Sequence, residues 1–225
     1  MDVLNWNVRS GGGKRIEEIA STIVAYTPDV VVITEYRKGK SGEHLKKLLN
    51  DSGLKHFSIA GCEENKNSSL IATKEKHEQS DLVVSPDLMP YIATAVVSGI
   101  HIIAPFCATG KVGEAFITFL SDIGTEKDFR ALATGDFFFG PRGSNRKYGR
   151  LVSEALTPAW FDLYNGDPKE PVWSFQNSSG GVSRPDHAWV TNNIRTKFSE
   201  AYFDLEPLDA GLSDHAPMLF SFGED

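Results

Sequence analysis

An aspartate and a histidine stand side by side near the end of the chain, where the polar residues 213–217 precede the apolar run 218–220. The carboxylate of Asp214 can bind a metal ion or orient a neighbouring group, and the imidazole of His215 titrates near neutral pH. Such a pair at the start of a strand indicates a catalytic site. An ordinary turn that enters a strand is the alternative interpretation.

Four further polar interruptions fall where apolar strand patterns end. They are the pair Asn5 and Asn7 within 3–8, Glu35 after 30–34, Asp136 after 132–135, and Asp186 before 188–190. An ionised carboxylate at a buried strand end costs several kcal/mol unless a cation or a hydrogen-bond donor compensates it. If these side chains converge, they predict a bound metal ion.

Strands and helices must position these residues. Sequence patterns typical of strands and of helices alternate along the whole chain. Strands are expected at 3–8, 30–34, 56–60, 69–73, 81–84, 92–97, 101–105, 131–134, 161–164, 171–175, 187–191, 198–203 and 217–222, and helices at 15–26, 43–50, 112–123 and 148–159. The pattern predicts an α/β fold, a four-layer sandwich of two mixed sheets packed face to face and flanked by helices. A doubly wound sheet is the alternative, but residues 55–108 supply too few crossover helices for it.

Composition is that of a soluble globular protein, with 40% hydrophobic and 24% charged residues, and no linker or repeat divides residues 1–225. We therefore expect a single domain. No apolar run approaches the ~20 residues that span a bilayer, which favours a cytoplasmic protein without a membrane partner. Cys62 and Cys107 lack metal-ligand spacing, so reduced thiols are expected.

The net charge of −7 disfavours binding of polyanions through overall charge alone. Two local basic segments follow the candidate site residues directly, and a solvated surface is the simpler explanation for either one alone. Their position favours contact with phosphate groups. The first segment is 37–40, and the second contains Arg142, Asn145, Arg146, Lys147 and Arg150.

Five segments occur in an order that resembles the endonuclease/exonuclease/phosphatase superfamily, whose members have the DNase I-like fold and include relatives of exonuclease III and apurinic endonucleases. They are 4–8, 33–35, 134–137, 183–187 and 213–217. The resemblance implies that Glu35 is the principal ligand of a Mg²⁺ or Mn²⁺ ion, since hard cations prefer oxygen ligands. It places Asn7 beside the ion, as a second ligand or an orienting group, and Asp214 at a second metal position or as a support of its loop.

The same resemblance assigns three catalytic roles. Asp136 orients or deprotonates the attacking water, and His215, held by Asp186, contacts or protonates a phosphoryl oxygen. The sequence departs from the superfamily at three places. Phe138 stands where the Gly-Asp-x-Asn pattern has its asparagine, and Asn145 or Asn177 could replace that group in space. Arg9 stands where many nuclease members have an acidic residue or asparagine, and the expected Tyr or His near 104–107 is not found.

The leading functional hypothesis is a metal-dependent phosphodiesterase that hydrolyses nucleic acid as an endo- or exonuclease. A phosphatase or phosphodiesterase for a small phosphorylated molecule or lipid headgroup is the alternative, because a small substrate needs no extended basic groove. A binding protein with a degenerate site is the third hypothesis, and Phe138 is its main support. The choice between DNA and RNA and the oligomeric state stay open.

Overall fold

Two main β-sheets dominate the computed structural model, which describes residues 1–106, 111–126, 128–137, 151–152, 156–158 and 173–223. The strands are Asp2–Asn7 (β1), Val30–Arg37 (β2), His56–Ile59 (β3), Asn67–Thr73 (β4), Ile92–Val97 (β5), Ile100–Pro105 (β6), Ala131–Asp136 (β7), Thr157–Pro158 (β8), Phe175–Gln176 (β9), Val182–Ser183 (β10), Asp186–Val190 (β11), Phe198–Phe203 (β12) and Met218–Phe222 (β13). The α-helices are Ile16–Ala25 (α1), Lys40–Asp51 (α2), Lys111–Thr125 (α3) and Glu206–Asp209 (α6), with 3₁₀ turns at Gly13–Arg15 (η1) and Asn192–Lys197 (η2).

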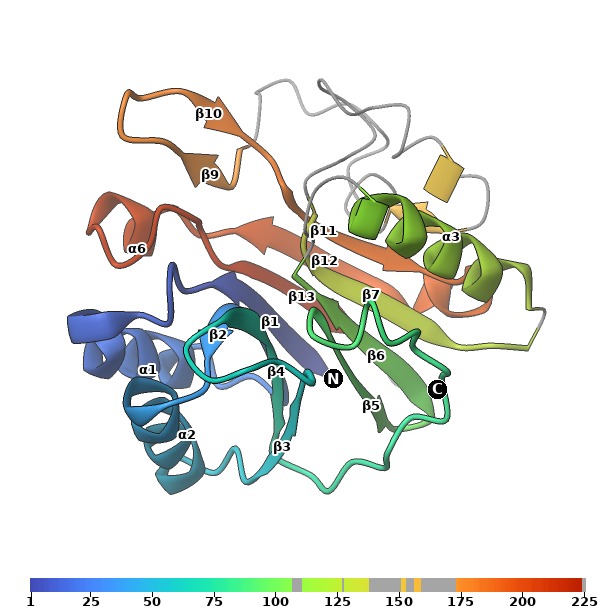
Figure 1. The fold of residues 1–225 in the computed structure, drawn as a ribbon, viewed down its shortest axis with the longest axis horizontal. Coiled ribbons are helices and arrows are strands. Elements are labelled where there is room, and N and C mark those ends of the chain that lie inside the picture. The colour runs from blue at the N-terminus through green and yellow to red at the C-terminus, as the bar shows by residue number, and fades with distance from the viewer. Residues whose placement is uncertain (107–110, 127, 138–150, 153–155, 159–172, 224–225) are drawn as a thin grey trace.

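The first sheet has the strand order β12-β13-β1-β2-β4-β3, and the second has the order β5-β6-β7-β11-β8. In the first sheet β1 lies parallel to β2 and antiparallel to β13. In the second, β7 lies parallel to β6 and antiparallel to β11. Both sheets are therefore mixed, and β9 and β10 form a separate hairpin (Figure 1).

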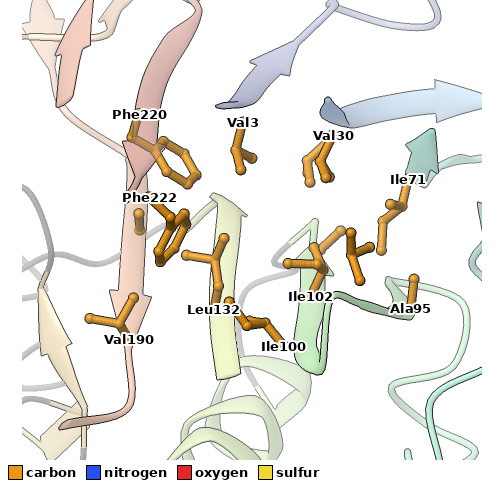
Figure 2. Close-up of a cluster of buried hydrophobic side chains, with 14 of the residues drawn as sticks. Val3, Val30, Ile71, Ala95, Ile100, Ile102, Leu132, Val190, Phe220 and Phe222 are labelled. Atoms are coloured by element: carbon orange, nitrogen blue, oxygen red, sulfur yellow. The ribbon is translucent and has the colours of Figure 1, made fainter. Parts of the chain in front are cut away.

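Alternation along the strands divides the buried side chains into layers. Val3 and its neighbours Val30 and Val32 face the second sheet, whereas Leu4 and Val31 face α1 and α2. Figure 2 shows the layer between the sheets, where side chains of both sheets meet. A third cluster packs α3 against the outer face of the second sheet. The predicted sandwich of two mixed sheets with flanking helices is confirmed (Figure 1).

Three of the expected elements are wrong or displaced. Residues 81–84 are not a strand: Val83 is 90% exposed, and the adjoining segment pairs with β5 only through an isolated bridge at Glu78. The helix expected at 148–159 does not extend over β8, which pairs with β11. Of the strand expected at 171–175, residues 173–174 are not in a strand and residue 175 begins β9. Residues 171–172 and the strand expected at 161–164 lie outside the described residues.

Cys62 is a buried free thiol, in agreement with the expected reduced state, and Cys107 lies outside the described residues. Within the part of the chain that the structure describes, every helix is too short or too polar to cross a bilayer.

Gly135 lies where β6 and β7 approach closely. A Cβ atom at this position would stand 2.2 Å from the carbonyl oxygen of Pro105, so Gly135→Ala must push the two strands apart. We expect the substitution to lower the free energy of unfolding by about 1–3 kcal/mol, as overpacking does, measured by urea denaturation. Gly61→Ala is the matched control, because its Cβ would meet nothing closer than 3.6 Å. Equal unfolding midpoints for the two variants would contradict the prediction.

Candidate active site

Strand ends from both sheets bring the candidate residues to one rim (Figure 1). Because β1 and β2 are parallel, their C-terminal parts lie on the same side of the first sheet, and these parts carry Asn7 and Glu35. His215 precedes β13, and because β13 is antiparallel to β1, its start lies beside the C-terminal end of β1. In the second sheet Asp136 and Asp186 are direct cross-strand partners. The rim of the sandwich therefore gathers residues from distant parts of the chain.

Glu35 is held by a local irregularity of β2. Its φ is 54°, and the register with β4 shifts between Thr34 and Tyr36, which is the signature of a β-bulge. Strain of this kind is characteristic of functional sites. The bulge lies within β2, two residues before its end, and there Glu35 Oε2 accepts the Ser10 backbone N–H at 2.6 Å.

The loop between β1 and η1 wraps around this carboxylate. Each of its residues 9–13 has a positive φ, a conformation for which glycine is the natural choice at 11–13. The backbone N–H of Gly11 donates to the carbonyl of Glu35 at 2.8 Å. The side chain of Arg15 donates to the carbonyl of Arg9 at 2.9 Å and also to the carbonyl of Leu212, which ties the loop to the segment before His215.

Asn7 joins the two sheets. Its Nδ2 group donates to Asp136 Oδ2 at 2.8 Å and to Glu35 Oε1 at 3.3 Å, while its Oδ1 accepts the Arg9 backbone N–H at 2.9 Å. The Asn7 amide nitrogen thus orients the carboxylates of Glu35 and Asp136. Its role as a metal ligand through Oδ1 stays a prediction.

Asp186 and His215 form a second, almost fully buried pair. His215 Nδ1 lies 2.8 Å from Asp186 Oδ2, which also accepts the Ser174 hydroxyl at 2.7 Å. Trp6 donates to the carbonyl of His215 at 2.8 Å, and the ring of Phe175 lies 4.8 Å from the imidazole centroid. These contacts fix the imidazole, and within the described part of the chain no hydrogen bond engages its Nε2.

Two titratable groups of the site, Asp136 and His215, have strongly shifted pKa values. Burial raises the pKa of Asp136 to about 7, and the negative charge of Asp186 adds to the rise, whereas His215 and Asn7 act against it. Burial alone would lower the pKa of His215, but the charge of Asp186 and the hydrogen bond to it raise that pKa to about 9. The site thus combines a carboxyl group whose pKa is near 7 with an imidazole whose pKa is well above 7.

Solved structures resemble the chain over its whole length, although no family model and no curated protein matches it. A single-residue variant of the 3′ phosphatase NExo from Neisseria, bound to a product DNA hairpin, has a TM-score of 0.83 at 19% identity and is covered completely, as is this chain. An AP endonuclease from Archaeoglobus fulgidus has a TM-score of 0.79 at 17% identity, with 99% of each chain covered. The chain has the DNase I-like fold.

A third solved structure with this fold is D. rerio TDP2, humanized by 14 mutations. It has a TM-score of 0.74 at 16% identity, and the match covers 100% of this chain and 99% of that one. The fold that the five sequence segments implied is thereby confirmed. On the DNase I-like fold of this chain, all five segments reach the rim that carries Glu35, Asp136 and His215.

Asp214, the other predicted metal ligand, faces Arg9 on this DNase I-like fold, with 3.5 Å between its Oδ2 and the arginine Nε. Among the described residues, no three acidic, histidine or cysteine side chains are grouped closely enough to form a metal site. A Mg²⁺ ion commonly uses only one or two carboxylates and completes its shell with water and substrate phosphate. Glu35, positioned by Ser10 and Asn7, fits that requirement.

Most of the predicted phosphate-binding residues lie in the part of the chain that the structure does not describe. Arg142, Asn145, Arg146, Lys147 and Arg150 lie outside the described residues, and so does Phe138. Asn177 is exposed in the turn between β9 and β10, where its Oδ1 accepts the N–H groups of Ser179 and Gly181 at 3.0 and 2.8 Å. In the structure Asn177 therefore stabilises the turn between β9 and β10.

Three serines of the site were missed by the sequence analysis. Ser10 binds Glu35, Ser174 binds Asp186, and the Ser213 hydroxyl donates to the carbonyl of Asn7 at 2.6 Å. Ser10 and Ser213 lie next to recognised segments and could have been suspected. Ser174 carries no signal, because only the folded chain brings it to β11.

Proposed function

We propose that the protein is a metal-dependent phosphoric ester hydrolase that cleaves nucleic acid with the help of Mg²⁺ or Mn²⁺. The observation that carries the proposal is the continuous network from Glu35 through Asn7 to Asp136, beside the pair of Asp186 and His215. The structural neighbours support it, since they include a 3′ phosphatase bound to DNA and an AP endonuclease.

The protein's own residues divide the proton transfers between them. Asp136, with a pKa of about 7, is about half ionised at neutral pH, and its ionised form can accept a proton from an attacking water. His215, with a pKa of about 9, is protonated and can donate through Nε2 to a phosphoryl oxygen. Asp186 keeps the imidazole in this orientation.

Glu35 would hold the divalent ion, with Ser10 and Asn7 fixing the direction of its carboxylate. When bound, the ion neutralises negative charge on the non-bridging phosphate oxygens. Ser10 and Asn7 would keep the Glu35 carboxylate from turning away when substrate enters.

The test is a substrate panel. The purified protein is incubated with Mg²⁺ or Mn²⁺ and with single- and double-stranded DNA, RNA, and oligonucleotides that end in a 3′ phosphate. We expect metal-dependent hydrolysis of at least one of them, abolished by Glu35→Gln and preserved by Glu63→Gln, which changes an exposed carboxylate. Absence of hydrolysis across the panel, or full activity of Glu35→Gln, would overturn the proposal. A small phosphomonoester completes the panel, and hydrolysis of it alone, unaffected by added salt, would favour a small substrate.

The dependence of kcat/KM on pH is expected to be bell-shaped. Activity should rise as Asp136 loses its proton near pH 7, because the base must be ionised, and fall as His215 loses its proton near pH 9, because the acid must be protonated. Initial rates at low substrate concentration between pH 5 and 10 measure both limbs. A rate that keeps rising beyond pH 10 would contradict the role of His215.

A further inference from the structure

We propose that Arg9 takes the place of a second divalent cation at this site. Its guanidinium group binds Asp214, leaves a single metal ion at Glu35, and presents its remaining N–H groups to a substrate phosphate. The inference rests on the proposed function and specifies how many ions that function uses.

The backbone of Arg9 is firmly held. Its N–H donates to Asn7 Oδ1 at 2.9 Å, and its carbonyl accepts Arg15 Nη2 at 2.9 Å and the Gly12 N–H at 3.2 Å. Asn7 lies two residues before Arg9 and Ser10 directly after it, and both contact the carboxylate of Glu35. The guanidinium therefore extends from a fixed point beside the proposed metal ligand.

Asp214 is held from the other side. Its carbonyl accepts the Gln176 N–H at 2.9 Å, and the preceding Ser213 is bonded to the carbonyl of Asn7. The pair of Arg9 and Asp214 thus links the loop after β1, which contacts Glu35, to the segment before β13, which contains His215. The two side chains are 57% and 29% exposed, so the pair is accessible to a ligand.

Charge explains why one ion is expected. A divalent cation bound to Asp214 would lie about 2.0–2.6 Å from a carboxylate oxygen, close to the guanidinium, and the two positive groups would repel each other. Only Nε of Arg9 has a partner in the described part of the chain. The other N–H groups form the planar fork that suits bidentate contact with phosphate.

Calorimetric titration with Mn²⁺ tests the number of ions. We expect about one equivalent to bind the unaltered protein, no binding to Glu35→Gln, and an affinity within about two-fold of the original for Asp214→Asn. Arg9→Asp should bind a second equivalent, because it replaces the repelling charge by a ligand. Two equivalents in the unaltered protein, a ten-fold weaker Asp214→Asn, or a single equivalent in Arg9→Asp would each overturn the inference and leave the proposed hydrolysis intact. Absence of any Mn²⁺ binding would contradict the proposed function as well.

Binding of a labelled oligonucleotide tests the phosphate contact. Fluorescence anisotropy is measured in EDTA, so that no cleavage occurs, over a range of salt concentrations. Arg9→Ala should weaken binding about ten-fold and lower the slope of log K against log salt by about 1, whereas Arg9→Lys should keep the slope. Lys47→Ala, on the outer surface of α2, is the control and should change neither. An unchanged slope in Arg9→Ala would show that Arg9 makes no phosphate contact and would overturn that part of the inference.

Discussion

Replacement of Asp136 by asparagine is expected to lower kcat by about 10²–10⁴-fold and, at the same time, to raise the melting temperature of the protein. The loss of rate follows because an amide cannot accept the proton of the attacking water. The gain in stability follows because the folded state holds the pKa of this buried carboxyl group above its ordinary value, to about 7. Ionisation of Asp136 therefore opposes folding.

The sign of this effect fixes its pH dependence. Below about pH 4 the carboxyl group is neutral in both the folded and the unfolded protein, and Asp136→Asn should change little. Between about pH 4 and 7 only the unfolded state ionises, so the penalty grows and then stays constant. Thermal unfolding at pH 8 should show a gain on the order of 2–4 kcal/mol, which shrinks at pH 5. Asp87→Asn, at an exposed site, is the control, and a lower melting temperature for Asp136→Asn at pH 8 would contradict the prediction.

Replacement of His215 by alanine is expected to lower kcat by a similar factor but to destabilise the protein. Its loss removes the proposed proton donor and leaves the charge of Asp186, at 1% exposure, without the imidazolium that neutralises it, although the Ser174 hydroxyl stays bonded to it. Breaking a buried ion pair in this way costs about 3–5 kcal/mol. Because the raised pKa of His215 reflects stabilisation of its charged form, the difference from the original protein should be largest below about pH 6.5 and fade as pH rises through about 9.

A second variant separates loss of chemistry from loss of fold. The double variant Asp186→Asn with His215→Gln removes both charges and can keep a hydrogen bond, so we expect it to recover much of the lost stability without recovering activity. Urea denaturation and single-turnover cleavage measure the two effects. If His215→Ala were as stable as the original protein at pH 6, the buried pair would not contribute as described.

Much of this arrangement could be predicted from the sequence, because it depends on local patterns. The β-branched run at 30–34 predicts a buried strand, which the structure confirms and extends through Glu35 to Arg37. The run at 81–84 misled for the same reason: its Leu-Val-Val sequence is typical of a strand, but no neighbouring strand extends along it. Strand patterns state what a segment can form, and pairing decides whether it does.

The finer features of the site depend on contacts between distant residues. The bulge that turns Glu35 outward arises from the register of β2 against β4, which periodicity does not show. The direction of the Asn7 amide follows from Asp136, which is far away in the sequence. The attachment of Arg9 to Asp214 likewise appears only when β13 has paired beside β1.

The pairing of β1 with β13 has a consequence for synthesis. β1 and β2 leave the ribosome early, but one edge of β1 stays unpaired until β13 emerges, and Asn7 and His215 belong to these two outermost parts of the chain. The rim that carries Asn7 and His215 can therefore form only after β13 has been translated, when Trp6 of β1 meets the carbonyl of His215. Until then β1 and β2 hold Asn7 and Glu35 without the imidazole that faces them in the folded protein.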